Sequence, residues 1–144
     1  MYLALQLTKR QRPLLDIAST SVASRTQCRD IVTDAATQSL LQQAFTIASS
    51  HHNNRLKAFA QGEIGHYHEC NGDYTKALDW SQQARLSASG DRVLALDTLY
   101  LWQWQTGRIY QTLGQSDAAV DFYSQAVDNL NQIRLEILAS NQTL

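Results

Sequence analysis

The chain has 144 residues with 44% hydrophobic residues, enough for one folded domain but not for two sizeable cores. Its net charge is −1 and only 17% of its residues are charged, which argues against a nucleic-acid surface. The only basic cluster, Lys9-Arg10-Gln11-Arg12, is interpreted as a solvated flank. No stretch reaches the about 20 apolar residues of a membrane span. We therefore expect neither a nucleic-acid partner nor a membrane partner.

The cysteine content predicts a reduced protein. Cys28 and Cys70 are too few for a disulfide framework, and the chain opens without a signal-peptide pattern. Both features are typical of a reducing compartment, so we expect a cytoplasmic protein without disulfides.

The first third of the chain predicts a degenerate pair of helices. Residues 1–12 read as a flank or a short helix, and Pro13 suits the first turn of a helix that ends near Cys28. A second helix is expected over about 31–50, where Gln42-Gln43-Ala44 resembles Gln82-Gln83-Ala84 further on. Together these segments form a degenerate pair over 13–50, as expected of a terminal repeat.

The middle of the chain gives the clearest helices. Apolar residues at helical spacing predict a helix over about 54–70, with Asn53 or Asn54 as its cap. Gly72 is placed to end it in the left-handed conformation, and Asp73 is placed to cap the next helix, over about 74–87. These two helices make a repeat over 54–89.

The last third repeats this arrangement. A helix is predicted over about 92–113, a turn at 114–116 with Ser116 as the cap, and a final helix over about 117–140. Four small residues of the first repeat are each matched by a small residue 42 positions later; Gly65, for example, is matched by Gly107. Small residues at this spacing let two helices pack closely, so the same packing is predicted twice, in an all-α fold. The matched pairs are Gly65/Gly107, Gly72/Gly114, Ala77/Ala119 and Ala84/Ala126.

These small positions resemble the tetratricopeptide (TPR) repeat, with Tyr110 at an aromatic position of that motif. The resemblance implies one domain over 1–144, a right-handed superhelix of about six helices in antiparallel pairs, with repeats at 54–89 and 92–140. The sequence departs from the motif at His68, at Gln61 and at Gln103, and it lacks the closing proline. Its 42-residue offset also exceeds the usual about 34.

A narrower resemblance covers residues 55–142. The runs 100–108, 119–127 and 130–134 are similar to the repeat region that precedes the caspase-like CHAT domain in bacterial, mostly cyanobacterial, proteins. This resemblance implies a recognition or regulatory segment and no proteolysis by this chain. It leaves open a second role, as a structural spacer or oligomerisation arm.

Candidate chemical groups gather near the end of the 54–70 helix. His66 and Cys70 share a face with Glu69 beside them, whereas His68 faces away. This set is small for a structural zinc site, which takes four ligands, and thiolates are disfavoured at helix C-termini. We therefore expect no metal, no cofactor and no catalytic residue, and His51-His52 is interpreted as an ordinary helix end.

The binding prediction follows from the repeat architecture, in which first helices line a concave groove. Trp104 and Arg108 are the predicted anchors for a protein or peptide, because Trp and Arg dominate binding energies at interfaces. The alternative is that Trp104 packs under the neighbouring helix pair, as Trp80 and Trp102 are expected to do. The predicted groove residues are Phe59, His66, Glu69, Leu101, Trp104, Arg108 and Gln111.

The last helix predicts a second contact surface. Leu135 and Leu138 lie off its main apolar stripe and widen the apolar surface beyond what an exposed terminal helix tolerates. We expect a downstream domain or a second copy of the chain to cover them. The overall prediction is a non-catalytic, protein-binding scaffold.

Overall fold

The computed structural model describes residues 28, 33–90 and 96–142 of the chain. Within them lie five helices and no strand: α3 (Ala35–Ser50), α4 (Asn54–Cys70), α5 (Tyr74–Ser89), α6 (Leu96–Thr112) and α7 (Ser116–Gln142). The all-helical prediction is confirmed. The helix predicted over 13–28 lies outside the described residues except for Cys28.

The helix ends follow the local signals in the sequence. The Asn53 side chain accepts a hydrogen bond from the backbone N–H of Leu56 at 3.0 Å, and Asp73 caps α5 through Lys76 in the same way. Gly72 lies between α4 and α5 with φ of +80°. A left-handed residue here is what a tight helix-to-helix turn requires.

Several helix boundaries differ from the prediction. Ser116 is the first residue of α7 rather than its cap, and α7 continues to Gln142. The described part of α6 begins at Leu96, because residues 91–95 are not described. α3 also begins later than expected, at Ala35, because Asp34 caps it by accepting a hydrogen bond from the N–H of Thr37.

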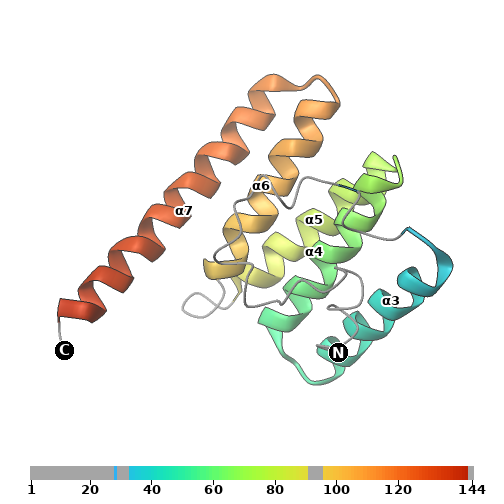
Figure 1. Ribbon diagram of the computed structural model, residues 1–144, viewed down its shortest axis with the longest axis horizontal. Coiled ribbons are helices and arrows are strands. Elements are labelled where there is room, and N and C mark those ends of the chain that lie inside the picture. Colours follow the sequence, from blue (N-terminus) through green and yellow to red (C-terminus); the bar gives the residue numbers. More distant parts are fainter. Residues whose placement is uncertain (1–27, 29–32, 91–95, 143–144) are drawn as a thin grey trace.

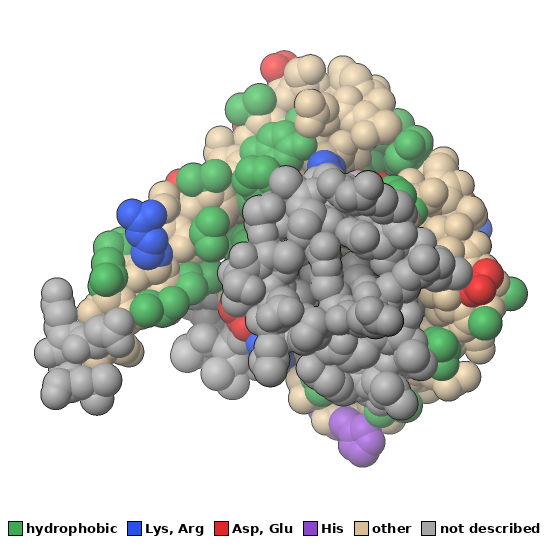
Figure 2. Space-filling view, viewed as in Figure 1, with side chains coloured by type: hydrophobic (Ala, Val, Ile, Leu, Met, Phe, Trp, Pro, Cys, Tyr) green, Lys and Arg blue, Asp and Glu red, His purple; other side chains and the backbone are tan. Residues whose placement is uncertain are grey.

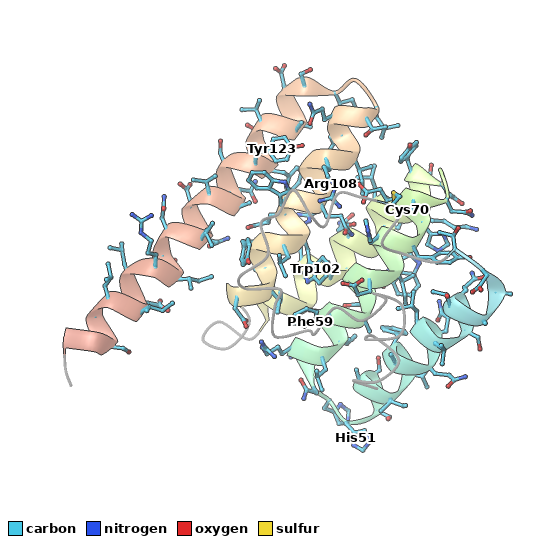
Figure 3. All side chains as sticks on the ribbon, in the orientation of Figure 1. His51, Phe59, Cys70, Trp102, Arg108 and Tyr123 are labelled. Carbon is cyan, nitrogen blue, oxygen red and sulfur yellow. A yellow bond between two sulfur atoms is a disulfide. The ribbon has the colours of Figure 1, made fainter. Side chains whose placement is uncertain are left out.

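Helices adjacent in the chain pack against one another. α4 packs against α5 and α6 against α7, while α5 joins the two pairs and α3 packs on α4 (Figure 1). Phe59 from α4 and Trp102 from α6 meet edge to face in the core, with ring centroids 5.8 Å apart (Figure 3). Trp102 is fully buried, as expected of a structural tryptophan.

Both predicted glycines lie where two helices touch. A Cβ built on Gly65 would lie 3.3 Å from the carbonyl oxygen of Ala77, and one on Gly107 would lie 3.2 Å from that of Ala119. Gly107 follows Gly65 by 42 residues, and Ala119 follows Ala77 by the same number. The prediction of the same close packing in both repeats is confirmed at Gly65 and Gly107. It was wrong for Gly72 and Gly114, which lie in turns where an added Cβ would have no heavy atom within 4 Å.

The two glutamines that depart from the TPR motif form matching polar bridges. Gln61 donates to Gln83 Oε1 (3.4 Å) and accepts from the Ser87 hydroxyl (2.7 Å), which joins α4 to α5. The second copy joins α6 to α7 with the same offset of 42: Gln103 donates to Gln125 (3.5 Å) and accepts from Asn129 (2.7 Å). Because Gln61 and Gln103 are buried, these hydrogen bonds offset the cost of removing their amides from water.

The packing of Trp102 on Gly62 yields a first prediction. A Cβ on Gly62 would overlap three carbons of the Trp102 indole ring, which is fully buried. We expect Gly62→Ala to lower the free energy of unfolding by about 2 kcal/mol, despite the better helix propensity of alanine. Urea denaturation followed by circular dichroism measures this loss.

The control is Gly90→Ala. Gly90 has ordinary right-handed backbone angles, and a Cβ added to it would have no heavy atom closer than 3.6 Å, so the change should be nearly neutral. Equal stability of the two variants would contradict the packing described for Trp102.

Candidate functional site

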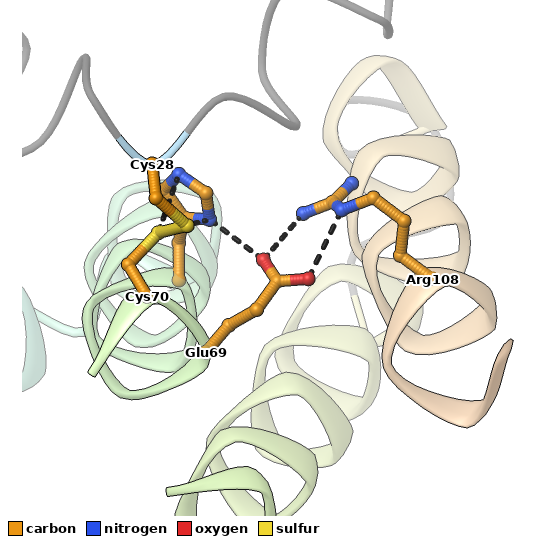
Figure 4. The surroundings of a disulfide bond; sticks show 5 residues. Cys28, Glu69, Cys70 and Arg108 are labelled. Atoms are coloured by element: carbon orange, nitrogen blue, oxygen red, sulfur yellow. Dashed lines mark hydrogen bonds and ion pairs between the residues drawn. A yellow bond between two sulfur atoms is a disulfide. The ribbon is translucent and has the colours of Figure 1, made fainter. Parts of the chain in front are cut away.

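Five side chains meet where the C-terminal end of α4 faces α6. Cys28 forms a disulfide with Cys70, the last residue of α4, and His66, Glu69 and Arg108 surround it (Figure 4). The expectation of a chain without disulfides was wrong. The two cysteines lie 42 residues apart with a Cα–Cα distance of 5.2 Å, a proximity that only the tertiary fold creates.

Glu69 holds the centre of this cluster. Arg108 donates from Nη2 to Glu69 Oε1 at 2.7 Å and from Nε to Oε2 at 3.0 Å, a bidentate pair between α6 and α4. His66 Nδ1 lies 2.8 Å from Oε1 of the same carboxylate. The Glu69 and Arg108 side chains are only 11% and 13% exposed, so little water screens their attraction.

The environment of Glu69 keeps it charged. Burial by itself raises the pKa of this carboxyl, but the hydrogen bond from His66 and the charge and hydrogen bonds of Arg108 outweigh it. The net result is a pKa below the ordinary value of a glutamate. The carboxylate is therefore a fixed negative charge that orients both of its partners.

His66 connects the carboxylate to the disulfide. Its ring is buried, and its Nε2 and Nδ1 lie 3.6 and 3.8 Å from Cys70 Sγ. One ligand atom from each of His66, Glu69 and Cys70 lies within 4.8 Å of the others, the one such metal-ligating group within the described residues. As folded, the Cys70 sulfur is bonded to Cys28 and carries no thiolate.

Three of the predicted groove residues face the interior of the described structure. Phe59, Leu101 and His66 are all buried, the first two within the hydrophobic core. Glu69 and Arg108, both predicted groove residues, instead bind each other. These five side chains have partners within the chain, so in this conformation they do not present an open binding surface.

The remaining two groove residues contact α7. The Trp104 ring is half-buried with its centroid 5.0 Å from that of Tyr123, and the Tyr123 hydroxyl donates to Gln111 at 2.7 Å. Trp104 therefore contacts α7, the second helix of its own pair, whereas the alternative interpretation placed it under the neighbouring pair. Gln111 is exposed.

Apolar side chains are exposed along α7. Leu135 and Leu138 are 66% and 52% exposed, and further apolar residues on α7 join them (Figure 2). That a downstream domain or a second copy covers them stays a prediction. Outside α7, the exposed large apolar residues among those described are single ones, Ile47, Leu86 and Leu113. We call the α7 set the uncovered face: Val120, Val127, Leu130, Leu135, Ile137 and Leu138.

The repeat shows why this face is uncovered. Leu78 and Arg85 of α5 are half-buried, and the Arg85 guanidinium lies 4.5 Å from the centroid of the Phe122 ring of α7. Their equivalents on α7, 42 positions on, are Val120 and Val127, which are 60% and 45% exposed. α6 packs against α5, but none of the described helices packs against the corresponding side of α7. The sequence pattern singled out Leu135 and Leu138 but not this matched pair.

Comparisons of the chain with protein-family models, with curated proteins and with solved structures find no match. None of the described helices combines the length and the apolar character needed to cross a membrane.

The Glu69–Arg108 pair yields a second prediction. Arg108→Ala leaves a nearly buried carboxylate without its cation, so we expect the free energy of unfolding to fall by about 3 kcal/mol. Chemical denaturation measures the loss. Arg55→Ala is the matched control, because Arg55 also pairs an α4 side chain with α6, through Asp97, but with side chains 41% and 48% exposed.

Removing the Arg55 charge should cost less than about 1 kcal/mol, as for most surface ion pairs. Similar losses for Arg108→Ala and Arg55→Ala would show that burial adds nothing to the Glu69–Arg108 pair.

A third prediction concerns pH. Because the pKa of Glu69 is lower in the folded chain than in the unfolded one, its contribution to stability is full above the unfolded pKa of about 4.3. It is lost as the pH falls through the folded value. We expect acidification below about pH 4.3 to destabilise the wild type more than Glu69→Gln, in denaturant titrations at several pH values.

Glu136→Gln, at an exposed position of α7, removes a carboxyl without touching the cluster and should follow the wild type. A Glu69→Gln profile parallel to that of the wild type would refute the assignment.

Proposed function

We propose that this chain is a non-catalytic protein-binding module built from TPR-like helix pairs. The support is the repetition of contacts at one offset: glycine against a backbone carbonyl and glutamine bridging to the second helix, in both α4–α5 and α6–α7. Such repeats build extended surfaces on which other proteins dock. The same contacts support a resemblance to TPR arrays despite the longer period.

The binding surface in this proposal is the uncovered face of α7. Contiguous exposed apolar surface typically marks an interaction site on a soluble domain. The observation that carries the proposal is the contrast between Leu78 and Arg85, covered on α5, and Val120 and Val127, exposed at the matching places on α7. A partner helix lying along α7 would complete the packing that α6 gives to α5.

This proposal moves the main contact away from the concave groove. The groove residues Phe59, His66 and Leu101 are buried, and Glu69 is held by Arg108. Half-buried Trp104 and exposed Gln111 remain as the accessible part of that set and lie beside Tyr123 of α7. They form a secondary contact next to the uncovered face.

The alternative role is a spacer or oligomerisation arm. It is favoured by the extension of α7, whose C-terminal part projects past α6 with Ile137 and Leu138 exposed (Figure 1). Two copies paired along these segments would bury the same residues. In the first role a different protein covers the uncovered face, and in the second a copy of this chain covers it. An experiment can distinguish the two.

The fourth prediction tests the face directly. Val127→Glu should abolish partner binding, because it places a charge in the centre of an apolar contact. Gln132→Glu is its control: it adds the same charge to an exposed position about 140° away around the helix. Affinity capture from cells that express the chain, with each variant as bait, compares partner recovery, and multi-angle light scattering gives the oligomeric state.

A specific partner retained by Gln132→Glu and lost by Val127→Glu supports the binding module, provided that both variants melt at the wild-type temperature. A dimer that becomes a monomer only in Val127→Glu supports the oligomerisation arm. A monomer whose captured proteins are identical in all three forms contradicts both roles for this face.

A further inference from the structure

The apolar stripe on α7 is long enough for one further helix. The residues of the uncovered face recur at intervals of three, seven and eight positions from Val120 to Leu138, which is the spacing of one side of a helix. This stretch rises about 27 Å along the axis of α7. An amphipathic helix of about five turns has the length to lie along it.

Two aspartates border this stripe. Asp121 and Asp128 are exposed and lie seven residues apart, so they share one side of α7. Each directly follows an apolar residue of the uncovered face, Val120 or Val127, and therefore lies about 100° from it around the helix. Asp117 lies on the same side, but it belongs to the first turn of α7, where the helix dipole favours an acidic residue in any case. The dipole does not account for Asp121 and Asp128.

The described residues supply no cation to these two aspartates. No lysine or arginine lies three or four positions from either of them, and neither forms an ion pair within the part of the chain that the structure describes. By contrast, Glu69 binds Arg108 and Asp97 binds Arg55. With four acidic residues and one arginine, α7 carries a net charge of −3. The uncovered face therefore combines an apolar stripe with a negative edge that is not neutralised.

We propose that the uncovered face binds a cationic amphipathic helix of another protein. The apolar side chains of that helix pack on the stripe, and its Lys or Arg side chains pair with Asp121 and Asp128. This inference rests on the proposed function, because it names the kind of partner that the same face takes. Burial of the stripe supplies the affinity, and the acidic edge selects the sign of the partner's charge.

The acidic edge disfavours a second copy of the chain as the occupant. Two-fold pairing brings identical patches of two copies together. In an antiparallel pair of α7 helices, Asp121 and Asp128 of one copy would therefore lie on the same side as those of the other, where like charges repel. A lipid surface is disfavoured as well, because helices that lie on membranes carry Lys and Arg beside their apolar face.

Arg134 gives the partner a direction. It is exposed and lies about 120° from Asp128 around the helix, among the apolar residues in the C-terminal half of α7. A partner cation placed against Arg134 would be repelled, whereas a carboxylate or an aromatic ring would be attracted. The cations of the partner therefore belong beside Asp121 and Asp128, and its acidic or aromatic residue belongs near Arg134.

The fifth prediction compares synthetic peptides of about 20 residues, the length of the stripe. The first has leucine on one helical face and lysine elsewhere, the second has glutamate in place of lysine, and the third has the composition of the first without helical periodicity. Fluorescence anisotropy with the full chain measures their affinities. We expect the first to bind at least about tenfold more tightly than the others, and to weaken when salt shortens the Debye length from about 10 Å to about 3 Å.

Charge reversal at two places on α7 locates the contact. Asp128→Lys should weaken binding of the lysine peptide about tenfold and strengthen binding of the glutamate peptide. Glu136→Lys is the matched control, because Glu136 is exposed and lies nine residues from Val127, about 180° around the helix. Val127→Gln removes an apolar contact without changing the charge and should weaken both peptides. Melting temperatures of the variants separate lost binding from lost folding.

The outcomes distinguish this inference from the proposed function. Equal affinities for the lysine and glutamate peptides, both lost in Val127→Gln, would overturn the cationic partner and keep the face as a binding surface. Equal effects of Asp128→Lys and Glu136→Lys would also overturn it, because net charge alone would then explain the binding. Peptide binding unchanged in Val127→Gln would contradict both proposals.

Two further results count against the cationic helix alone. A wild-type dimer that dissociates in Val127→Gln, seen by multi-angle light scattering, would give the face to a second copy. If none of the peptides binds, the cationic helix is overturned, while affinity capture with Val127→Glu and Gln132→Glu still decides the proposed function.

Discussion

The close approach of paired helices at Gly65 and Gly107 is the constraint on which the described structure depends. Each glycine Cα faces a backbone carbonyl of the next helix, Ala77 in one pair and Ala119 in the other, so close that an added Cβ would crowd it. Because backbone cannot move aside as a side chain can, these contacts fix the separation of the two helices. The positions of all side chains between the helices follow from it.

Polar side chains also help to fix how the two helices of each pair are aligned along their length. Gln61 and Gln103 would be poor core residues in isolation, because a buried amide without partners costs free energy. Each is paired with two side chains of the following helix, and the partners recur at the same offset. A hydrogen bond is directional where apolar packing is not, so these bridges oppose a sliding of one helix along the other.

Sequence reasoning reached most of the fold, because it rests on local signals. The start of α4 after Asn53 and its end before Gly72 follow from cap and turn chemistry that only a few neighbouring residues decide. The pairing of Glu69 with Arg108 was not predicted. Helical periodicity placed both residues near one groove, but it does not give the distance between side chains on different helices. The Cys28–Cys70 bond was missed for the same reason. The number of cysteines indicates whether a framework of several disulfides is expected, but it does not show that two particular cysteines lie close together in the fold.

The period of the repeat ties the disulfide to the rest of the molecule. Cys28 and Cys70 are separated by 42 residues, as are Arg55 and Asp97, which join α4 to α6. Two residues that are 42 positions apart occupy the same place in successive repeats, so a contact between them joins one repeat to the next. The next equivalent place after Cys70 is Thr112, whose hydroxyl donates to the Arg108 carbonyl and offers no sulfur. The disulfide is therefore confined to one junction of the repeat, while the helical packing that frames it continues to α7, where apolar side chains are exposed.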